Sequence, residues 1–136
     1  MAEDLLAKAR EEINEIDKKM AELFTLRMEA VKQIAEYKSA NGLKIFDAQR
    51  EAEVIDRNFS YVKGDLQKHY LKFLKSNMEI SKNYQHRLLE GMRVAFSGVE
   101  GAFANIAAKK VFPDAKAVAY PDFKAAYNSV VEGMTD

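Results

Sequence analysis

Two long cationic side chains interrupt the apolar stripe of the first helical pattern in this sequence. Arg27 lies between Leu23 and Ala30, and Lys38 follows Ile34. In a helix, the eleven residues from Arg27 to Lys38 make about three turns, so both side chains project from nearly the same face, with a rise of about 16 Å between them. Two cations that reach toward each other from these positions could grip a small dianion.

A second group of charges opens the stretch IFDAQREAEVIDR, residues 45–57. Asp47, Arg50 and Glu51 are three and four residues apart, so they share one face of a helix that continues with apolar Val54 and Ile55. Taken alone, these charges are best explained by an N-terminal turn that favours acidic residues and by a solvated salt bridge.

A hydroxyl and an amide lie on the inward stripe of a third helical pattern. Ser81 and Gln85 continue the apolar series of Leu74, Met78 and Leu88. Each polar group on a buried stripe costs free energy unless it finds a partner. Any one of these side chains could reach water or bond to the nearby backbone. Together they favour a polar pocket between three helices, formed by Arg27, Lys38, Asp47, Arg50, Glu51, Ser81 and Gln85.

Arg10 poses a geometric question. It precedes Arg27 by 17 residues, which is about 25 Å along one helix. A small ligand cannot bridge that distance within one chain. Arg10 is therefore either a surface residue or a residue that enters the pocket of an antiparallel partner chain.

Residues 1–91 follow helical periodicity throughout. The first helix is expected from Leu5, with Asp4 as its cap, to the stop at Asn41-Gly42. A second is expected from about Asp47 to Val62, and a third from the cap Asp65 to Gly91. The first helix is too long to bury its stripe against the two shorter ones, so a second copy of the chain is expected to cover the remainder.

Residues 93–136 follow a different pattern. Strands are expected in RVAF and AKAVAY, each followed by a helix, in the β-α-β-α order of a parallel-sheet domain. Two strands and two helices are too few to close an α/β core. We therefore predict an all-α domain over residues 1–91, followed over residues 93–136 by the incomplete beginning of an α/β domain.

The amino-acid composition argues against several classes of protein. The 21 basic and 21 acidic residues balance, which gives no electrostatic reason to expect nucleic acid or a membrane surface as partner. Cysteine is absent, and His69 and His86 have no cluster of metal-binding residues around them, so we predict neither a metal site nor a cofactor. No apolar run approaches the ~20 residues of a membrane span, and the acidic start MAEDLL is no signal peptide, so a cytoplasmic protein is expected.

The polar pattern resembles the all-helical chorismate mutases over residues 5 to about 90. The residues that carry the resemblance are Arg10, Arg27, Lys38, Asp47, Arg50, Glu51, Ser81 and Gln85. The segments VAFSGVEGAFANIAAKKVF and FKAAYNSVVEG are similar to the start of prephenate dehydratases, with Val99 and Ala104 departing from the usual proline and small hydroxyl residue. This order resembles the bifunctional chorismate mutase–prephenate dehydratases (P-proteins) of phenylalanine biosynthesis. The dehydratase's Thr-Arg-Phe motif and phenylalanine-sensing domain do not occur here, so only mutase activity is expected.

The resemblance implies an intertwined homodimer in which each site borrows Arg10 from the other chain. Chorismate would rearrange to prephenate without a covalent intermediate or proton transfer. By resemblance, Arg10 and Arg27 bind the two carboxylates of the substrate, and Ser81 assists them. Lys38 reaches a carboxylate and the ether oxygen, and Gln85 donates a second hydrogen bond to that oxygen.

The remaining roles concern the second helix. By resemblance, Glu51 holds the ring hydroxyl of chorismate, aided by the backbone at Asp47, and Arg50 lines the pocket. Two alternatives remain: an isochorismate pyruvate lyase on the same fold, and a non-catalytic helical dimerisation module. The dehydratase-like segment argues against the first, and turnover of chorismate would exclude the second.

Overall fold

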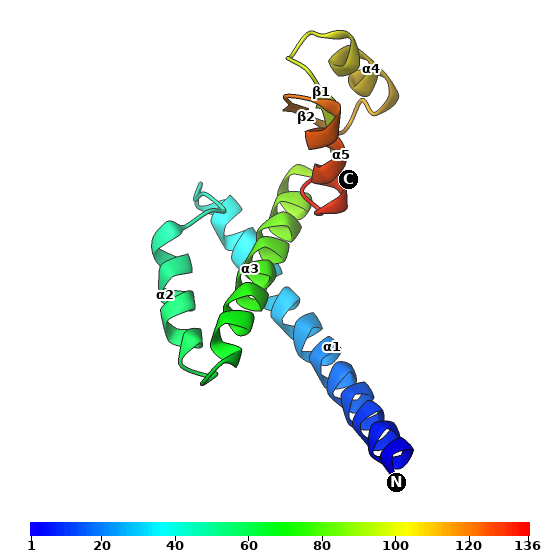
Figure 1. The fold of residues 1–136 in the computed structure, drawn as a ribbon. Coiled ribbons are helices and arrows are strands. Elements are labelled where there is room, and N and C mark those ends of the chain that lie inside the picture. Colours follow the sequence, from blue (N-terminus) through cyan, green and yellow to red (C-terminus); the bar gives the residue numbers. More distant parts are fainter.

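The computed structural model describes all 136 residues as five helices and two strands (Figure 1). In chain order these are α1 (Ala2–Ala40), α2 (Ala48–Phe59), α3 (Leu66–Glu90), β1 (Arg93–Ser97), α4 (Phe103–Val111), β2 (Lys116–Tyr120) and α5 (Phe123–Val131). The type and order of every element agree with the sequence predictions, and most ends agree to within three residues.

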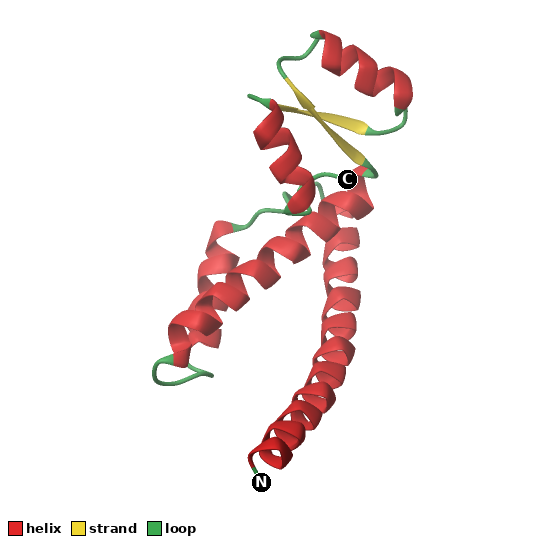
Figure 2. Cartoon of the chain, turned by 45° about the vertical axis from the view of Figure 1, so that its right-hand side comes forward, coloured by secondary structure: helices red, strands yellow, loops and turns green.

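Helix α1 contains 39 residues and is therefore about 58 Å long. Its N-terminal half projects away from the rest of the molecule without any contact partner, as Figure 2 shows, and its only buried residues are Val31 and Ala35. The predicted cap at Asp4 is wrong, because the helix already begins at Ala2 and Asp4 lies in its first turn. An acidic side chain there is favourable without capping, since it faces the positive end of the helix dipole.

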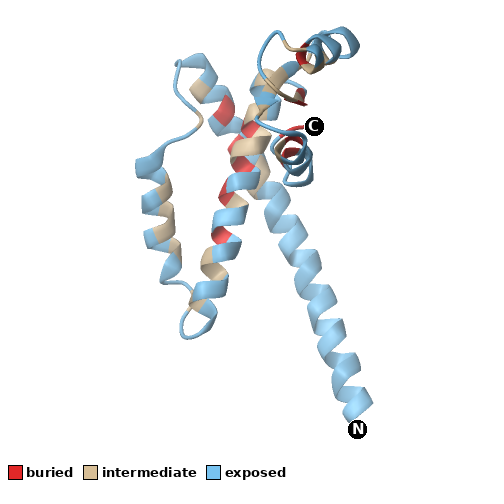
Figure 3. Cartoon of the chain, turned by 45° about the horizontal axis from the view of Figure 1, so that its top comes forward, coloured by how far each residue is buried: buried red, intermediate tan, exposed pale blue.

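Helix α3 forms the centre of the helical part. It packs against the C-terminal half of α1 on one side and against α2 on the other (Figure 1). Its buried residues are Leu74, Met78, Ser81 and Gln85, which repeat at spacings of three and four and form one continuous buried stripe (Figure 3). The prediction that a hydroxyl and an amide belong to this stripe is confirmed.

The two aspartates at the starts of α2 and α3 behave differently. Asp47 has extended backbone angles, and its carboxylate accepts a hydrogen bond of 3.0 Å from the backbone N–H of Arg50. Asp65 precedes α3 in a helical conformation and makes no side-chain capping bond, so its predicted role as a cap is wrong. A carboxylate reaches the free N–H groups of the first turn only from a non-helical backbone.

Residues 93–136 form a two-stranded parallel sheet with a helix after each strand. Strand β1 pairs with β2 in a register that runs from Arg93–Lys116 to Ser97–Tyr120, and both α4 and α5 contact the strands. Large apolar side chains stay uncovered in this small unit, with Phe103 at 92% exposure. Four elements thus provide too little surface to bury their own apolar faces.

Polar contacts attach this unit to the C-terminal end of α3. The carboxylate of Asp136 accepts hydrogen bonds from the backbone N–H of Arg93 at 2.8 Å and from the guanidinium of Arg87 at 3.1 Å. Lys116 pairs with Glu90 at 3.0 Å. Burial alone would raise the pKa of Glu90, but the hydrogen bond and charge of Lys116 outweigh it, and the pKa is lowered. None of the helices combines the length and hydropathy that a membrane crossing requires.

Because Asp47 caps α2 and Asp65 does not cap α3, substitutions of the two residues should affect stability differently. Asp47→Ala should lower the free energy of unfolding by about 1 kcal/mol, because it removes the hydrogen bond to the backbone N–H of Arg50. Asp65→Ala is the matched control and should cost less than about 0.5 kcal/mol, since only a favourable interaction with the helix dipole is lost. Urea unfolding at one fixed protein concentration measures both values. Equal losses would contradict the assignment of Asp47 as the capping residue.

Candidate functional site

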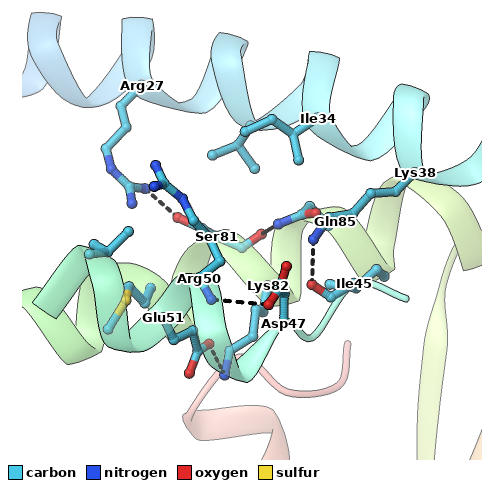
Figure 4. A pocket seen from close by; sticks show the side chains of 13 residues that line it. Arg27, Ile34, Lys38, Ile45, Asp47, Arg50, Glu51, Ser81, Lys82 and Gln85 are labelled. Atoms are coloured by element: carbon cyan, nitrogen blue, oxygen red, sulfur yellow. Dashed lines mark hydrogen bonds and ion pairs between the residues drawn. The ribbon is translucent and has the colours of Figure 1, made fainter. Parts of the chain in front are cut away.

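A cavity of about 170 Å³ lies between α1, α2 and α3 (Figure 4). Its lining comes from the C-terminal half of α1, the loop before α2, the first two turns of α2 and the middle of α3. Seven of the eight polar residues singled out in the sequence line it: Arg27, Lys38, Asp47, Arg50, Glu51, Ser81 and Gln85. The predicted polar pocket among three helices is therefore present.

The guanidinium of Arg27 enters this cavity from α1 and donates a hydrogen bond to the hydroxyl of Ser81 on α3 (Figure 4). Ser81, only 6% exposed, in turn bonds to the backbone carbonyl of Asn77 at 2.8 Å. Burial lowers the pKa of Arg27 from its ordinary value, although a guanidinium remains charged at neutral pH. No carboxylate of the chain pairs with Arg27, so its charge is available to a ligand.

Lys38 also lies on α1, at the opposite end of the cavity from Arg27. Its ammonium donates a hydrogen bond of 2.6 Å to the backbone carbonyl of Ile45, in the loop before α2. This bond uses one of its three N–H donors and holds the side chain across the cavity (Figure 4). Like Arg27, Lys38 has no acidic partner within the chain.

Gln85 is buried at 7% exposure and has an unfilled hydrogen-bonding position. Its amide nitrogen makes a long bond of 3.4 Å to the carbonyl of Ser81, whereas its amide oxygen Oε1 has no partner. Leaving a buried polar atom unpaired costs about 1–3 kcal/mol. The amide nitrogen carries two N–H donors, and the long bond to Ser81 uses one of them, so the second can meet a ligand that accepts a hydrogen bond.

The three charged residues that line the cavity from the start of α2 and its N-cap do not act as one group. Asp47 is engaged as the helix cap, and Arg50 turns toward Glu53 of its own helix at 3.5 Å, with both side chains about half exposed. Glu51 instead points to α3, where it pairs with Lys82 (Figure 4). Of the three, only Glu51 therefore forms an ion pair with a residue of another helix that lines the cavity.

Lys82 was not identified from the sequence. Its ammonium lies 2.8 Å from Glu51 and 2.6 Å from Glu79, and 5.1 Å from the ring centre of Phe46. Burial alone would lower the pKa of Lys82, but the hydrogen bonds and charges of the two glutamates outweigh it and raise the pKa. The three-residue spacing from Glu79 was visible in the sequence, but the contact with Glu51, 31 residues away, exists only in the folded chain.

Apolar side chains also complete the cavity wall, and the sequence did not single them out as part of a site. They are Val31, Ile34, Ile45, Val54 and Met78. Apolar walls exclude water and lower the local dielectric constant, which strengthens the interaction of a bound anion with the cations. The cavity thus combines charged groups with apolar walls and stays open to solvent at Ile34, which is 49% exposed.

Arg10 is the predicted residue that the single chain does not bring to the site. It lies on the exposed N-terminal half of α1 and does not line the cavity. Figure 1 shows this half of the helix leading away from α2 and α3. Within one chain Arg10 is a surface residue.

A polar cavity among three packed helices, with two cations that lack counter-charges, defines a helical protein whose site suits a small anion. The family model of chorismate mutase type II matches residues 9–86, which is more than half of the sequence, and the chain belongs to this family. The protein is accordingly an isomerase that converts chorismate to prephenate, a reaction of aromatic amino acid biosynthesis. Comparison with curated proteins and with solved structures gave no match.

The matched range bears directly on the site. It contains all 13 residues that line the cavity, together with Arg10, and it ends four residues before the end of α3. Residues 93–136 lie outside it. The family assignment therefore concerns the helical part alone.

Proposed function

We propose that chorismate rearranges to prephenate in the cavity between α1, α2 and α3. The observation that carries this proposal is that eight polar residues, from three helices and the N-cap of α2, line one cavity inside the range that the family model matches. The reaction is unimolecular: a carbon–oxygen bond breaks while a carbon–carbon bond forms, and no proton is transferred. The site therefore needs to hold a compact conformer and stabilise developing charge rather than supply a nucleophile or base.

The charges of the cavity suit a dianion. Glu51 is balanced by Lys82, and Arg50 by Glu53, whereas Arg27 and Lys38 have no acidic partner. Two uncompensated positive charges correspond to the two carboxylates of chorismate. Binding would replace the lost hydration of these cations with charge-assisted hydrogen bonds.

The roles on α1 and α3 follow from the available donors. Arg27, already oriented by Ser81, presents its remaining N–H groups to one carboxylate. Lys38 has two N–H donors left beside its bond to Ile45, enough for a carboxylate and the ether oxygen. Gln85 offers the second N–H of its amide, beside the long bond to Ser81, to the same ether oxygen, where negative charge grows in the transition state.

Glu51 is assigned to the ring hydroxyl of the substrate. Its Oε1 atom accepts a hydrogen bond from Lys82, which leaves Oε2 as the acceptor for a ligand. A carboxylate oxygen accepts a hydrogen bond from a hydroxyl but repels a carboxylate. Glu51 therefore favours one end of the substrate and disfavours the reversed orientation.

We also propose a dimer in which Arg10 completes the cavity of the partner. The chain exposes 10465 Å², whereas a compact monomer of 15.4 kDa would expose about 7,200 Å². Much of the excess lies on α1, where Leu6, Ile13, Ile16 and Met20 are 46–55% exposed at helical spacing. Arg10 lies between Leu6 and Ile13 on this face, so an antiparallel partner helix that covers the face also receives Arg10.

For residues 93–136 we propose a relation to the start of prephenate dehydratase domains. The support is the sequence similarity of the segments around β1, α4 and α5, together with the parallel pairing of β1 and β2. The uncovered Phe103 and Phe123 fit an α/β layer that further elements would cover. Dehydratase activity is not expected from these residues, which do not contain the Thr-Arg-Phe motif.

The direct test of the proposed function is turnover of chorismate. We expect the ultraviolet absorbance of chorismate to fall when the protein is added, with prephenate as the product. Release of pyruvate instead would indicate a lyase, and unchanged absorbance with folded protein would indicate a non-catalytic helical module. Chromatography of the product separates these outcomes.

The proposed dimer generates a complementation prediction. Arg10→Ala and Lys38→Ala should each be nearly inactive as homodimers. After unfolding together in equal amounts and refolding, half of the dimers should be mixed, with both defects in one site and the other site intact. Activity should therefore recover to about one quarter of the wild-type value. No recovery, with mixed dimers demonstrated by mass spectrometry, would contradict the cross-chain role of Arg10.

Gln85 generates a prediction about pH. Its amide donates a hydrogen bond at any ordinary pH, so kcat/KM of the wild type should be nearly flat between about pH 5 and 8. In Gln85→Glu the carboxyl donates only below its pKa, which has a reference value of about 4.3, is raised by burial and is lowered by Lys38. Above that pKa the carboxylate repels the developing charge, so activity should be present in acid and lost as pH rises. Profiles of equal shape would contradict the contact between Gln85 and the ether oxygen.

A further inference from the structure

We propose that Lys82 is a positioning residue that holds Glu51 at the edge of the cavity, so that Glu51 binds a neutral hydroxyl and does not neutralise the cations of the site. The inference rests on the proposed function, because it assigns the contact that makes the role of Glu51 possible. It concerns a side chain that the pattern of polar residues on helical stripes did not reveal.

The pair formed by Glu51 and Lys82 is the only ion pair that joins α2 to α3. Helix α2 has no buried residue, so apolar packing alone fixes its position on α3 weakly. The ammonium of Lys82 lies 2.8 Å from Glu51, and the side chain of Lys82 is 19% exposed. A short and largely covered ion pair therefore sets where the carboxylate on this weakly packed helix lies.

Lys82 is itself held from several sides. Its second carboxylate partner, Glu79, lies 2.6 Å away on the outer side of the same helix, and the ring of Phe46 covers the ammonium at 5.1 Å. Two of its three N–H donors thus meet carboxylates, and the third direction is limited by the ring. An ammonium restrained in this way presents one fixed hydrogen bond to Glu51, where a freely rotating lysine would not.

The position of Glu51 matters because the same cavity contains two cations without acidic partners, Arg27 and Lys38. An unrestrained carboxylate in such a cavity is attracted to the nearest free cation, since opposite charges interact strongly where water is excluded. Glu51 would then occupy a charge that a carboxylate of the substrate needs. Lys82 prevents this competition, and Oε2 of Glu51 stays available to a hydroxyl group.

This arrangement predicts a specific relation between two substitutions. Lys82→Met should lower kcat/KM for chorismate at least tenfold, mainly by raising KM, because Glu51 then competes with the substrate for Arg27 or Lys38. Lys82→Arg should stay within about threefold of the wild type, since its guanidinium can still bond to the carboxylate. In the Lys82→Met background, adding Glu51→Gln should restore kcat/KM by at least threefold, because a neutral amide does not compete for cations.

Lys75→Met is the matched control, because Lys75 is exposed on the same helix and forms no ion pair. It should stay within about twofold of the wild type. Steady-state kinetics with chorismate give kcat and KM separately, and circular dichroism reports folding. If Lys82→Met does not fold, Lys82→Gln is the second variant, with a smaller rise in KM that Glu51→Gln again relieves.

Two different results would overturn two different claims. If the wild type converts chorismate but Glu51→Gln lowers activity further in the Lys82→Met background, or Lys82→Met behaves like the control, Lys82 does not restrain Glu51. A rise in kcat/KM on substitution of Lys82 would equally overturn the inference, since it would mean that Lys82 withholds Glu51 from the substrate. If the wild type does not convert chorismate at all, the proposed function itself fails.

Discussion

The hydrogen bond between Arg27 and Ser81 is the interaction on which the site depends, because it connects α1 to α3 inside their packed face. Both residues occupy helical positions that apolar side chains would otherwise fill, and each alone would carry an unmet hydrogen-bonding group into the interior. Bonding to each other removes that cost for Ser81 and leaves most of the guanidinium's donors unused. The polar residues on the two helix stripes therefore line a cavity, while α1 and α3 stay packed against each other.

Charge balance then gives the cavity its selectivity. Acidic and basic side chains both line it, but the acidic ones are compensated, Glu51 by Lys82 and Asp47 by the N-terminus of α2. The cations on α1 remain uncompensated. In the proposed function, this distribution attracts an anion to one side and accepts a hydroxyl on the other, as an asymmetric substrate such as chorismate requires. The apolar residues in the cavity wall lower the local dielectric constant and so strengthen these interactions.

The length of α1 explains both the open shape of the single chain and the position of Arg10 outside the cavity. A helix of 39 residues extends well beyond what α2 and α3 can cover, so only two of its residues are buried. The exposed half carries both a regular apolar face and Arg10. In the proposed dimer, the surface that drives association also delivers the missing cation, so assembly and completion of the site would be one event.

Sequence periodicity predicted the helical elements and most of the cavity because the 3.6-residue repeat of a helix determines which residues share a face. Arg27, Lys38, Ser81 and Gln85 could be assigned to inward stripes from their spacing alone, and the structure places all four at one cavity. Caps were predicted less well. A capping bond depends on the backbone angles of a single residue, which is why Asp65 has the right chemistry and does not cap.

The spacing of residues three and four apart was therefore enough to predict the helices, their stripes and most of the polar residues on those stripes. Which side chains meet across helices depends on the tertiary structure. Lys82 contacts Glu51 only because α2 folds back onto α3, and Arg10 stays outside the cavity because the unbroken helix α1 carries it about 25 Å away from Arg27. Contacts between distant residues depend on how helices cross, and no local pattern encodes that angle.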